Sequence, residues 1–137
     1  EASTPAFKKY ANQVVKNAKV LGEDLKKYGF NLVSGGTENH LLLVDLRNKN
    51  ITGAQAADLL EESGITINKN SIPYDPVGPF KPSGIRMGTP AITTRGMKEK
   101  EMKMIANWIN QVITEKKSPK KIREEIRKLC KKFPLPA

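Results

Sequence analysis

Hydrophobic and polar residues alternate with helical spacing over the first 28 residues of the chain. Thr4 is suited to cap a helix, Pro5 suits its first turn, and Gly29 suits its end. Apolar side chains recur between them at steps of three and four residues, the spacing of one helix face. They are Phe7, Ala11, Val14, Ala18, Leu21 and Leu25. The pattern predicts a long amphipathic helix over residues 4–28.

Shorter apolar runs follow, and their lengths are typical of strands. The run from His40 to Leu46 is apolar almost throughout, so we expect a strand that is covered on both faces. The other runs predict short strands over residues 30–33, 65–68 and 84–88.

Two further helices are predicted between and after these strands, and a third near the end of the chain. Thr52 can cap a helix over 53–63 that Gly64 ends, and Thr93 or Thr94 can cap a helix over about 96–115. Trp108 and the methionines of that helix are expected in the core. Ser118 and Pro119 begin the last helix, which continues to Lys132. A long N-terminal helix, a small sheet and packed helices indicate a two-layer α/β domain, with the strand order left open.

Residues 69–83 interrupt this pattern, because they contain four prolines. A loop of this length in a compact domain is often functional, and the alternative is an ordered surface connection. The preceding segment, Asn68-Lys69-Asn70, is either a polar recognition element or a simple turn after a strand.

Composition narrows the possible functions. The 137 residues suffice for one domain with a core, and they contain no apolar run of membrane-spanning length and no secretory signal. Cys130 is the only cysteine, which fits a reducing cytoplasm and predicts a bystander thiol. His40 is the only histidine, so we expect a structural role for it and no metal site. The chain starts at Glu1, as a fragment or a processed product would.

The net charge of +10 is unevenly distributed. Residues 116–132 contain nine basic and two acidic side chains, so this segment alone carries +7. Its basic residues surround an apolar stripe of Ile122, Ile126 and Leu129, which favours a solvated helix docked on the domain. The alternative is a surface for a polyanion such as nucleic acid. We therefore divide the chain into a domain over 1–115 and a basic helix and tail over 116–137.

Arg86 is the most distinctive candidate for a functional residue. It stands between Ile85 and Met87 in a predicted strand, which we expect to point it into a cleft. The planar guanidinium can hold a carboxylate through two parallel hydrogen bonds. The alternative is a structural ion pair with Asp45 or Asp75.

Five strings, in order along the chain, resemble the C-terminal domain of serine hydroxymethyltransferase, a pyridoxal-phosphate enzyme of the aminotransferase-like fold (fold type I). The resemblance runs from about Pro5 to Val112 and fades in the basic tail. The strings are Leu32-Val33-Ser34-Gly35-Gly36-Thr37-Glu38-Asn39-His40, Val44-Asp45-Leu46-Arg47, Gly64-Ile65-Thr66-Ile67-Asn68-Lys69-Asn70, Ser83-Gly84-Ile85-Arg86-Met87-Gly88-Thr89-Pro90-Ala91 and Thr93-Thr94-Arg95-Gly96.

The resemblance implies a small domain of an enzyme that converts serine and tetrahydrofolate to glycine and methylenetetrahydrofolate. It assigns the substrate carboxylate to Arg86 and folate contacts to Asn70 and to Gly78, Pro79 and Phe80. Gly78 stands where the family usually has serine. No lysine here follows the family's threonine run and histidine, so this chain should lack the Schiff-base lysine. Most contacts to pyridoxal phosphate should then belong to a large domain, the parent should be a homodimer, and this chain alone should be inactive.

Two other classes of function compete with this interpretation. A stand-alone nucleic-acid-binding module would use the basic segment 116–132, although it would not explain the string 83–90. A scaffold or interaction domain would tolerate replacement of Arg86 without chemical consequence.

Overall fold

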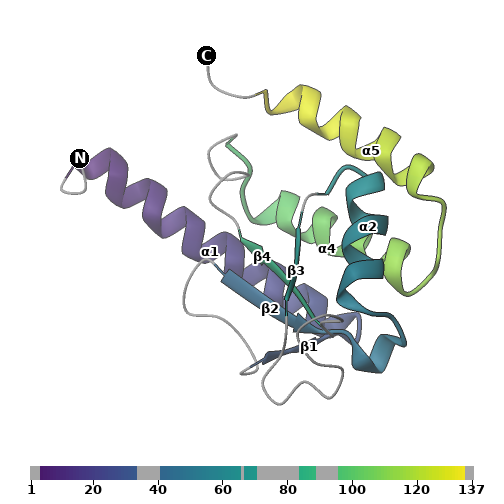
Figure 1. The fold of residues 1–137 in the computed structure, drawn as a ribbon. Coiled ribbons are helices and arrows are strands. Elements are labelled where there is room, and N and C mark those ends of the chain that lie inside the picture. The colour runs from purple at the N-terminus through teal and green to yellow at the C-terminus, as the bar shows by residue number, and fades with distance from the viewer. Residues whose placement is uncertain (1–3, 34–40, 66, 71–83, 89–95, 135–137) are drawn as a thin grey trace.

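The computed structural model describes residues 4–33, 41–65, 67–70, 84–88 and 96–134, and the fold is given for these (Figure 1). The helices and strands follow one another along the chain as the sequence analysis expected, with shifted boundaries in two places. They are α1 (Pro5–Lys27), β1 (Asn31–Leu32), β2 (Leu41–Asp45), the 3-10 helix η2 (Arg47–Lys49), α2 (Gly53–Glu62), β3 (Asn68–Asn70), β4 (Gly84–Gly88), α4 (Glu99–Ile113) and α5 (Pro119–Lys132).

The four strands form one antiparallel sheet in the order β1-β2-β4-β3. The central pair joins β2 to β4, two strands that are distant in sequence, with Leu43 opposite Arg86 and Val44 opposite Ile85. On the other side of β4, Asn68 of β3 lies opposite Arg86. The strand that carries Arg86 is therefore an interior strand, held by neighbours on both sides.

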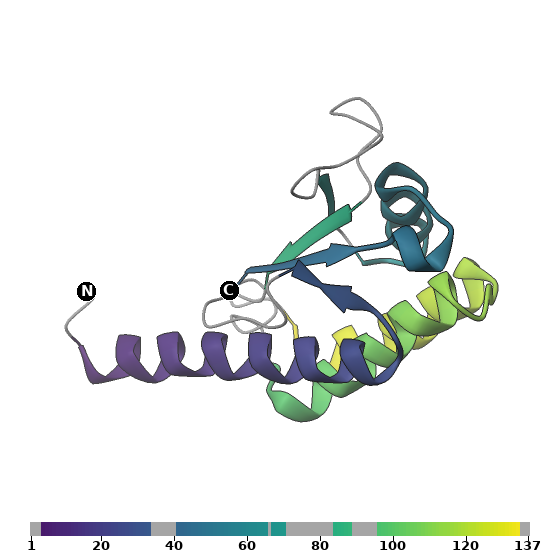
Figure 2. The same cartoon turned by 90° about the horizontal axis from the view of Figure 1, so that it is seen from below.

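Helices pack against one face of this sheet and make the expected two-layer α/β arrangement (Figure 2). Leu42, Val44, Ile85 and Met87 point into this face and are buried. They share one hydrophobic cluster with residues of the helices, including Leu21 and Leu25 of α1, Leu60 of α2 and Met102, Ala106 and Ile109 of α4. Leu43, between Leu42 and Val44, is only partly buried. The expectation that β2 is fully covered on both faces was therefore wrong.

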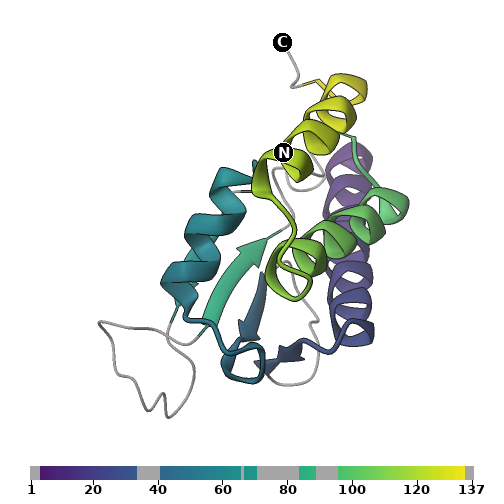
Figure 3. The same cartoon turned by 90° about the vertical axis from the view of Figure 1, so that its right-hand side faces the viewer.

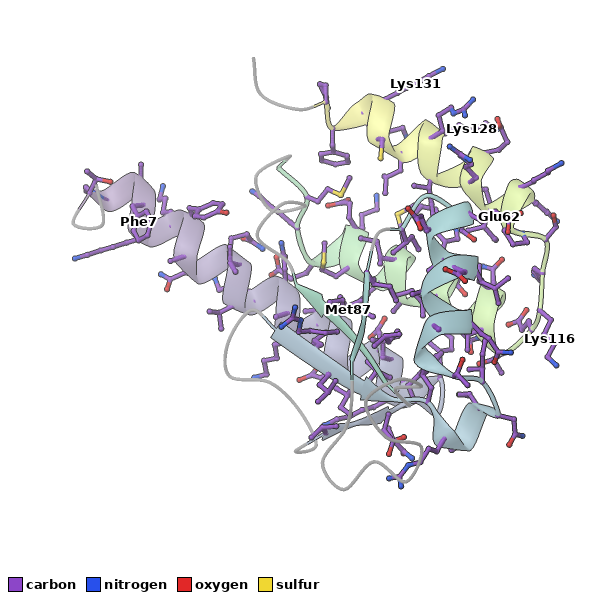
Figure 4. All side chains as sticks on the ribbon, in the orientation of Figure 1. Phe7, Glu62, Met87, Lys116, Lys128 and Lys131 are labelled. Carbon is purple, nitrogen blue, oxygen red and sulfur yellow. The ribbon has the colours of Figure 1, made fainter. Side chains whose placement is uncertain are left out.

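The helix α1 is capped as the sequence predicts, but its first turns leave the body of the domain. The Thr4 hydroxyl accepts a hydrogen bond from the Phe7 N–H at 3.1 Å. Val14, Ala18, Leu21 and Leu25 are buried, whereas Phe7 is 42% exposed. Figure 4 shows Phe7 on the part of α1 that projects beyond the sheet. The apolar stripe thus contributes to the core only from Val14 onward.

The helix α2 begins and ends at the predicted signals. The Thr52 hydroxyl accepts from the Gln55 N–H at 3.1 Å, and the Gln55 side chain accepts from the Thr52 N–H at 3.0 Å, which completes a capping box. Gly64 follows the helix with φ of +94°, a left-handed conformation that glycine adopts at low cost. The capping box therefore defines the start of α2, and Gly64 defines its end.

Two boundaries differ from the prediction. The third strand is Asn68–Asn70 instead of 65–68, because Ile65 and Ile67 pack against the core before the chain reaches β4. The helix α4 begins at Glu99, and its N-cap residue is Lys98, so neither Thr93 nor Thr94 caps it. The Glu101 carboxylate accepts from the Lys98 N–H at 2.8 Å and satisfies one of the free donors at this end.

The basic segment forms α5, which docks on α2 and α4 across their ends (Figure 3). Ile122, Ile126 and Leu129 are buried, and all nine basic side chains between 116 and 132 are exposed. Lys128 and Lys131 point away from the body in Figure 4. The prediction of a docked helix with a charged outer face is confirmed. Within the described residues, no helix is long and apolar enough to cross a membrane.

Candidate binding site on the open face of the sheet

Strand β4 presents Arg86 on the face of the sheet opposite the hydrophobic core. Its neighbours Ile85 and Met87 are 0% and 7% exposed, whereas Arg86 is exposed. Because successive side chains of a strand point to opposite faces, burial of the two apolar neighbours fixes the direction of the arginine. The strand predicted over 84–88 is confirmed, and the expected cleft around Arg86 stays a prediction.

The register of the sheet brings a second predicted site residue close to Arg86. Asn68 lies directly opposite Arg86, and Asn70 lies two positions further along β3, opposite Gly84. Asn68-Lys69-Asn70 is therefore a strand, and the alternative of a simple turn was wrong. The sheet places Asn70 and Arg86 on adjacent strands. The other predicted residues, Gly78, Pro79 and Phe80, and also His40 and Asp75, lie outside the described residues.

An acidic residue at the end of β2 is bound by another arginine. Arg47 Nη2 donates to Asp45 Oδ2 at 2.7 Å, and Arg47 Nε lies 3.1 Å from both carboxylate oxygens. The Arg47 backbone N–H also donates to Asp45 Oδ1 at 3.0 Å. Asp45 is thus paired with Arg47, and the alternative that it holds Arg86 was wrong.

The side chain of Arg86 is exposed. It makes no ion pair or side-chain hydrogen bond with any residue that the structure describes. The partly buried Leu43 stands opposite it on β2 and provides an apolar neighbour. An exposed planar cation on an ordered strand is suited to hold a carboxylate in a fixed orientation. Elsewhere in the described ranges, no group of His, Cys, Asp and Glu could hold a metal ion.

A set of hydrogen bonds between polar side chains near the start of α4 was not predicted from the sequence. Asn17 is 0% exposed, and its Nδ2 donates to the Met97 carbonyl oxygen at 2.9 Å. Gln13 Nε2 donates to Asn17 Oδ1 at 2.8 Å and to Glu99 Oε1 at 2.6 Å. The signal was present in the sequence, since Asn17 occupies a position between Val14 and Leu21 on the apolar stripe of α1.

The same chain of contacts alters the protonation of Glu99. The hydrogen bond from Gln13 lowers the pKa of the Glu99 carboxyl below its ordinary value, and the positive charges of Lys16 and Lys98 act in the same direction. Glu99 is therefore ionised at neutral pH and stays ionised in mildly acidic solution. This group connects α1 to the first turn of α4, apart from the Arg86 site.

Other residues singled out from the sequence have structural surroundings. Trp108 is 4% exposed, and its Nε1–H donates to Glu125 Oε1 of α5 at 3.3 Å. The expectation that Trp108 belongs to the core is confirmed. Cys130 is a partly buried free thiol on α5.

The family model described as Serine hydroxymethyltransferase matches residues 1–109. The matched span contains α1, the complete sheet with Arg86 and Asn70, and most of α4. It ends before α5.

Proposed function

The chain belongs to the serine hydroxymethyltransferase family, and on this basis we propose that it is the C-terminal small domain of an enzyme of fold type I that interconverts serine plus tetrahydrofolate with glycine plus methylenetetrahydrofolate. The observation that supports this proposal most directly is the exposed Arg86 between two buried residues of an interior strand. A second support is the position of Asn70 on the neighbouring strand.

In this proposal Arg86 binds the carboxylate of serine or glycine. Two parallel N–H···O bonds orient the amino acid as well as attract it, so the reacting bond is held in one direction. The burial of Ile85 and Met87 in the core limits the movement of the backbone that carries Arg86. Leu43 beside it reduces the access of water to the bound carboxylate.

Asn70 and the loop residues Gly78, Pro79 and Phe80 bind the folate in this proposal. An amide group both donates and accepts hydrogen bonds, which suits a pterin edge that has both kinds of group. Gly78 replaces the serine that is usual in the family, so its contact to folate is through the backbone. Phe80 offers an aromatic surface for the ring system.

Pyridoxal phosphate supplies the electron-withdrawing ring for this chemistry when it is bound. The residues described here do not fit its covalent attachment. The lysines with described side chains are exposed, except Lys49, which is partly buried and donates to the Tyr28 carbonyl oxygen at 3.0 Å. None of these has the desolvated surroundings of a Schiff-base lysine. We propose that a large domain outside this chain holds the cofactor, that the parent enzyme is a homodimer, and that this chain alone is inactive.

The deciding experiment is turnover of serine with tetrahydrofolate by the full-length enzyme, with Arg86→Ala and Arg86→Lys as variants. Loss of the bidentate contact should lower kcat/KM on the order of a thousand-fold for Arg86→Ala. Arg86→Lys keeps the charge without the planar fork and should be intermediate. An active enzyme that is indifferent to both changes would make Arg86 structural. An enzyme without folate-dependent turnover would exclude the proposed reaction.

A further inference from the structure

The helix α5 lies outside the span that the family model matches, and the reaction proposed above uses none of its side chains. The match ends at residue 109, and α5 begins at Pro119. Its inner side is fixed on the domain, because Ile122 is 0% exposed and Trp108 Nε1–H donates to Glu125 Oε1 at 3.3 Å. The helix lies at the periphery, against α2 and α4 (Figures 1 and 3). Its outer side therefore has a fixed orientation.

Two rows of cations run along the outer side of α5. Residues four and seven positions apart lie on the same side of a helix, and neighbouring residues are about 100° apart around its axis. The first row is Lys120, Arg127 and Lys131, and the second is Lys121, Lys128 and Lys132. All six side chains are exposed. Figure 4 shows Lys128 and Lys131 pointing away from the body of the domain.

Acidic side chains offset little of this charge. Glu124 lies 3.5 Å from Arg127, but both side chains are more than half exposed, and an exposed pair of this kind is weak. Glu125 is turned inward, where it accepts the hydrogen bond from Trp108. Within the part of the chain that the structure describes, the five lysines of the two rows make no ion pair. The outer face is therefore a strongly positive surface that attracts a polyanion.

The outer face lacks the side chains by which two kinds of polyanion are usually held. Membrane-surface helices insert apolar side chains among the lipids, and single-stranded nucleic acids stack on aromatic rings. The outer face of α5 has only lysine, arginine and Glu124. The large hydrophobic residues that are exposed in the described part of the chain, Phe7 and Val15, lie on α1. The partner of α5 must therefore be held by charge alone.

The arrangement in two rows fits a concave partner with charge on both walls. A helix with its side chains is about 10–12 Å across, and the major groove of B-form DNA is about 12 Å wide. Cations on the two flanks of a helix in that groove face the phosphates of both strands. The major groove of duplex RNA is too narrow for this arrangement.

We propose that the outer face of α5 is a docking surface for double-stranded B-form DNA, whose phosphates bind the two rows of cations. The binding is independent of base sequence, because lysine and arginine contact phosphates through charge and the outer face has no amide side chain to read a base edge. This inference goes beyond the proposed function and does not rest on it, since no residue of the Arg86 site takes part.

Its test is fluorescence anisotropy of a labelled DNA duplex of mixed sequence with the complete 137-residue chain. Six phosphate contacts give a slope of log K against log salt of about −5, so affinity should fall on the order of a thousand-fold between about 50 and 200 mM salt. The variant with Lys121→Gln, Lys128→Gln and Lys131→Gln loses three contacts. Its slope should be about −3, and its Kd should rise on the order of a hundred-fold.

The matched control removes the same number of charges from exposed positions of α1, with Lys8→Gln, Lys19→Gln and Lys26→Gln. This variant should bind the duplex as wild type does, and equal weakening by both variants would overturn the proposal. Absence of duplex binding at about 50 mM salt would also overturn it. Two further probes test the choice of partner. A single strand of the same length that binds as tightly as the duplex would contradict docking in a groove. Tighter binding to vesicles containing phosphatidylserine would assign the surface to a membrane instead.

Discussion

The side-chain amide of Asn17 donates a hydrogen bond to the Met97 carbonyl oxygen across 2.9 Å and joins α1 to the segment that leads into α4. Asn17 is fully buried, and its Oδ1 accepts from Gln13 at 2.8 Å, so both ends of the amide are bonded. This arrangement stabilises the contact between the two helices because no polar atom of that amide is left without a partner.

Replacement of Asn17 by alanine should lower the free energy of unfolding by about 1–3 kcal/mol, because the buried Met97 carbonyl loses its donor. Urea denaturation measures the change. Asn12→Ala, at an exposed position of the same helix, is the control and should stay within about 0.5 kcal/mol of wild type. Equal effects of the two substitutions would contradict the importance of the Met97 contact.

Acid should weaken the link between α1 and α4 through Glu99. The hydrogen bond from Gln13 lowers the pKa of this carboxyl in the folded state, so the unfolded chain takes up the proton first as the pH falls. The contribution of Glu99 is therefore present above the ordinary glutamate pKa of about 4.3 and is lost as the pH falls through the lower folded value. Thermal unfolding between pH 3 and 7 measures it.

The Gln13→Leu variant should have a flatter dependence of Tm on pH in the acidic range, since the largest cause of the lowered pKa is removed. Glu99→Gln should flatten it further. A wild-type slope in both variants would show that other carboxyls determine the acid sensitivity.

The alternation along β4 predicts that substitutions at two neighbouring residues differ strongly in their effect on stability. Ile85→Ala should cost about 2–5 kcal/mol, because Ile85 is 0% exposed in the core. Arg86→Ala should stay within about 0.5 kcal/mol, because Arg86 is exposed and has no described ion-pair partner. Chemical denaturation separates the two. A large loss of stability with Arg86→Ala would indicate a structural arginine.

Gly96 should resist substitution because of its backbone conformation. A Cβ there would be in ordinary contact with Phe133, so the cost of Gly96→Ala comes from φ of +91° and should be about 1–2 kcal/mol. Asparagine tolerates the left-handed region better than alanine, so Gly96→Asn should be milder. Calorimetry of the two variants tests this order, and the reverse order would point to crowding instead.

Local signals predicted much of this fold. The Thr4 cap, the Thr52 cap, Gly64 and the amphipathic pattern of α5 each depend on residues that are close together in the sequence. The alternation around Arg86 belongs to the same class, because burial of Ile85 and Met87 follows from a strand with one covered face.

Features that depend on distant partners were harder to predict. The strand β3 is defined by its pairing with β4, and the alternating Ile65 and Ile67 suggested a strand too early. Phe7 is exposed because the start of α1 extends past the rest of the domain. The helical pattern of the sequence does not show where the domain ends. The pairing of Asp45 with Arg47 was also not predicted, because the sequence gives no reason to prefer Arg47 over Arg86 as the partner of Asp45.

The family match and the folding unit have different boundaries. The match stops at Ile109, but α4 continues to Ile113, and Val112 and Ile113 are buried. A fragment expressed to the boundary of the match would end inside a helix and uncover the apolar surface that α5 closes. It would be prone to aggregate, whereas expression through Phe133 would keep the core closed. The C-terminal boundary for recombinant work is therefore better drawn from packing than from family similarity.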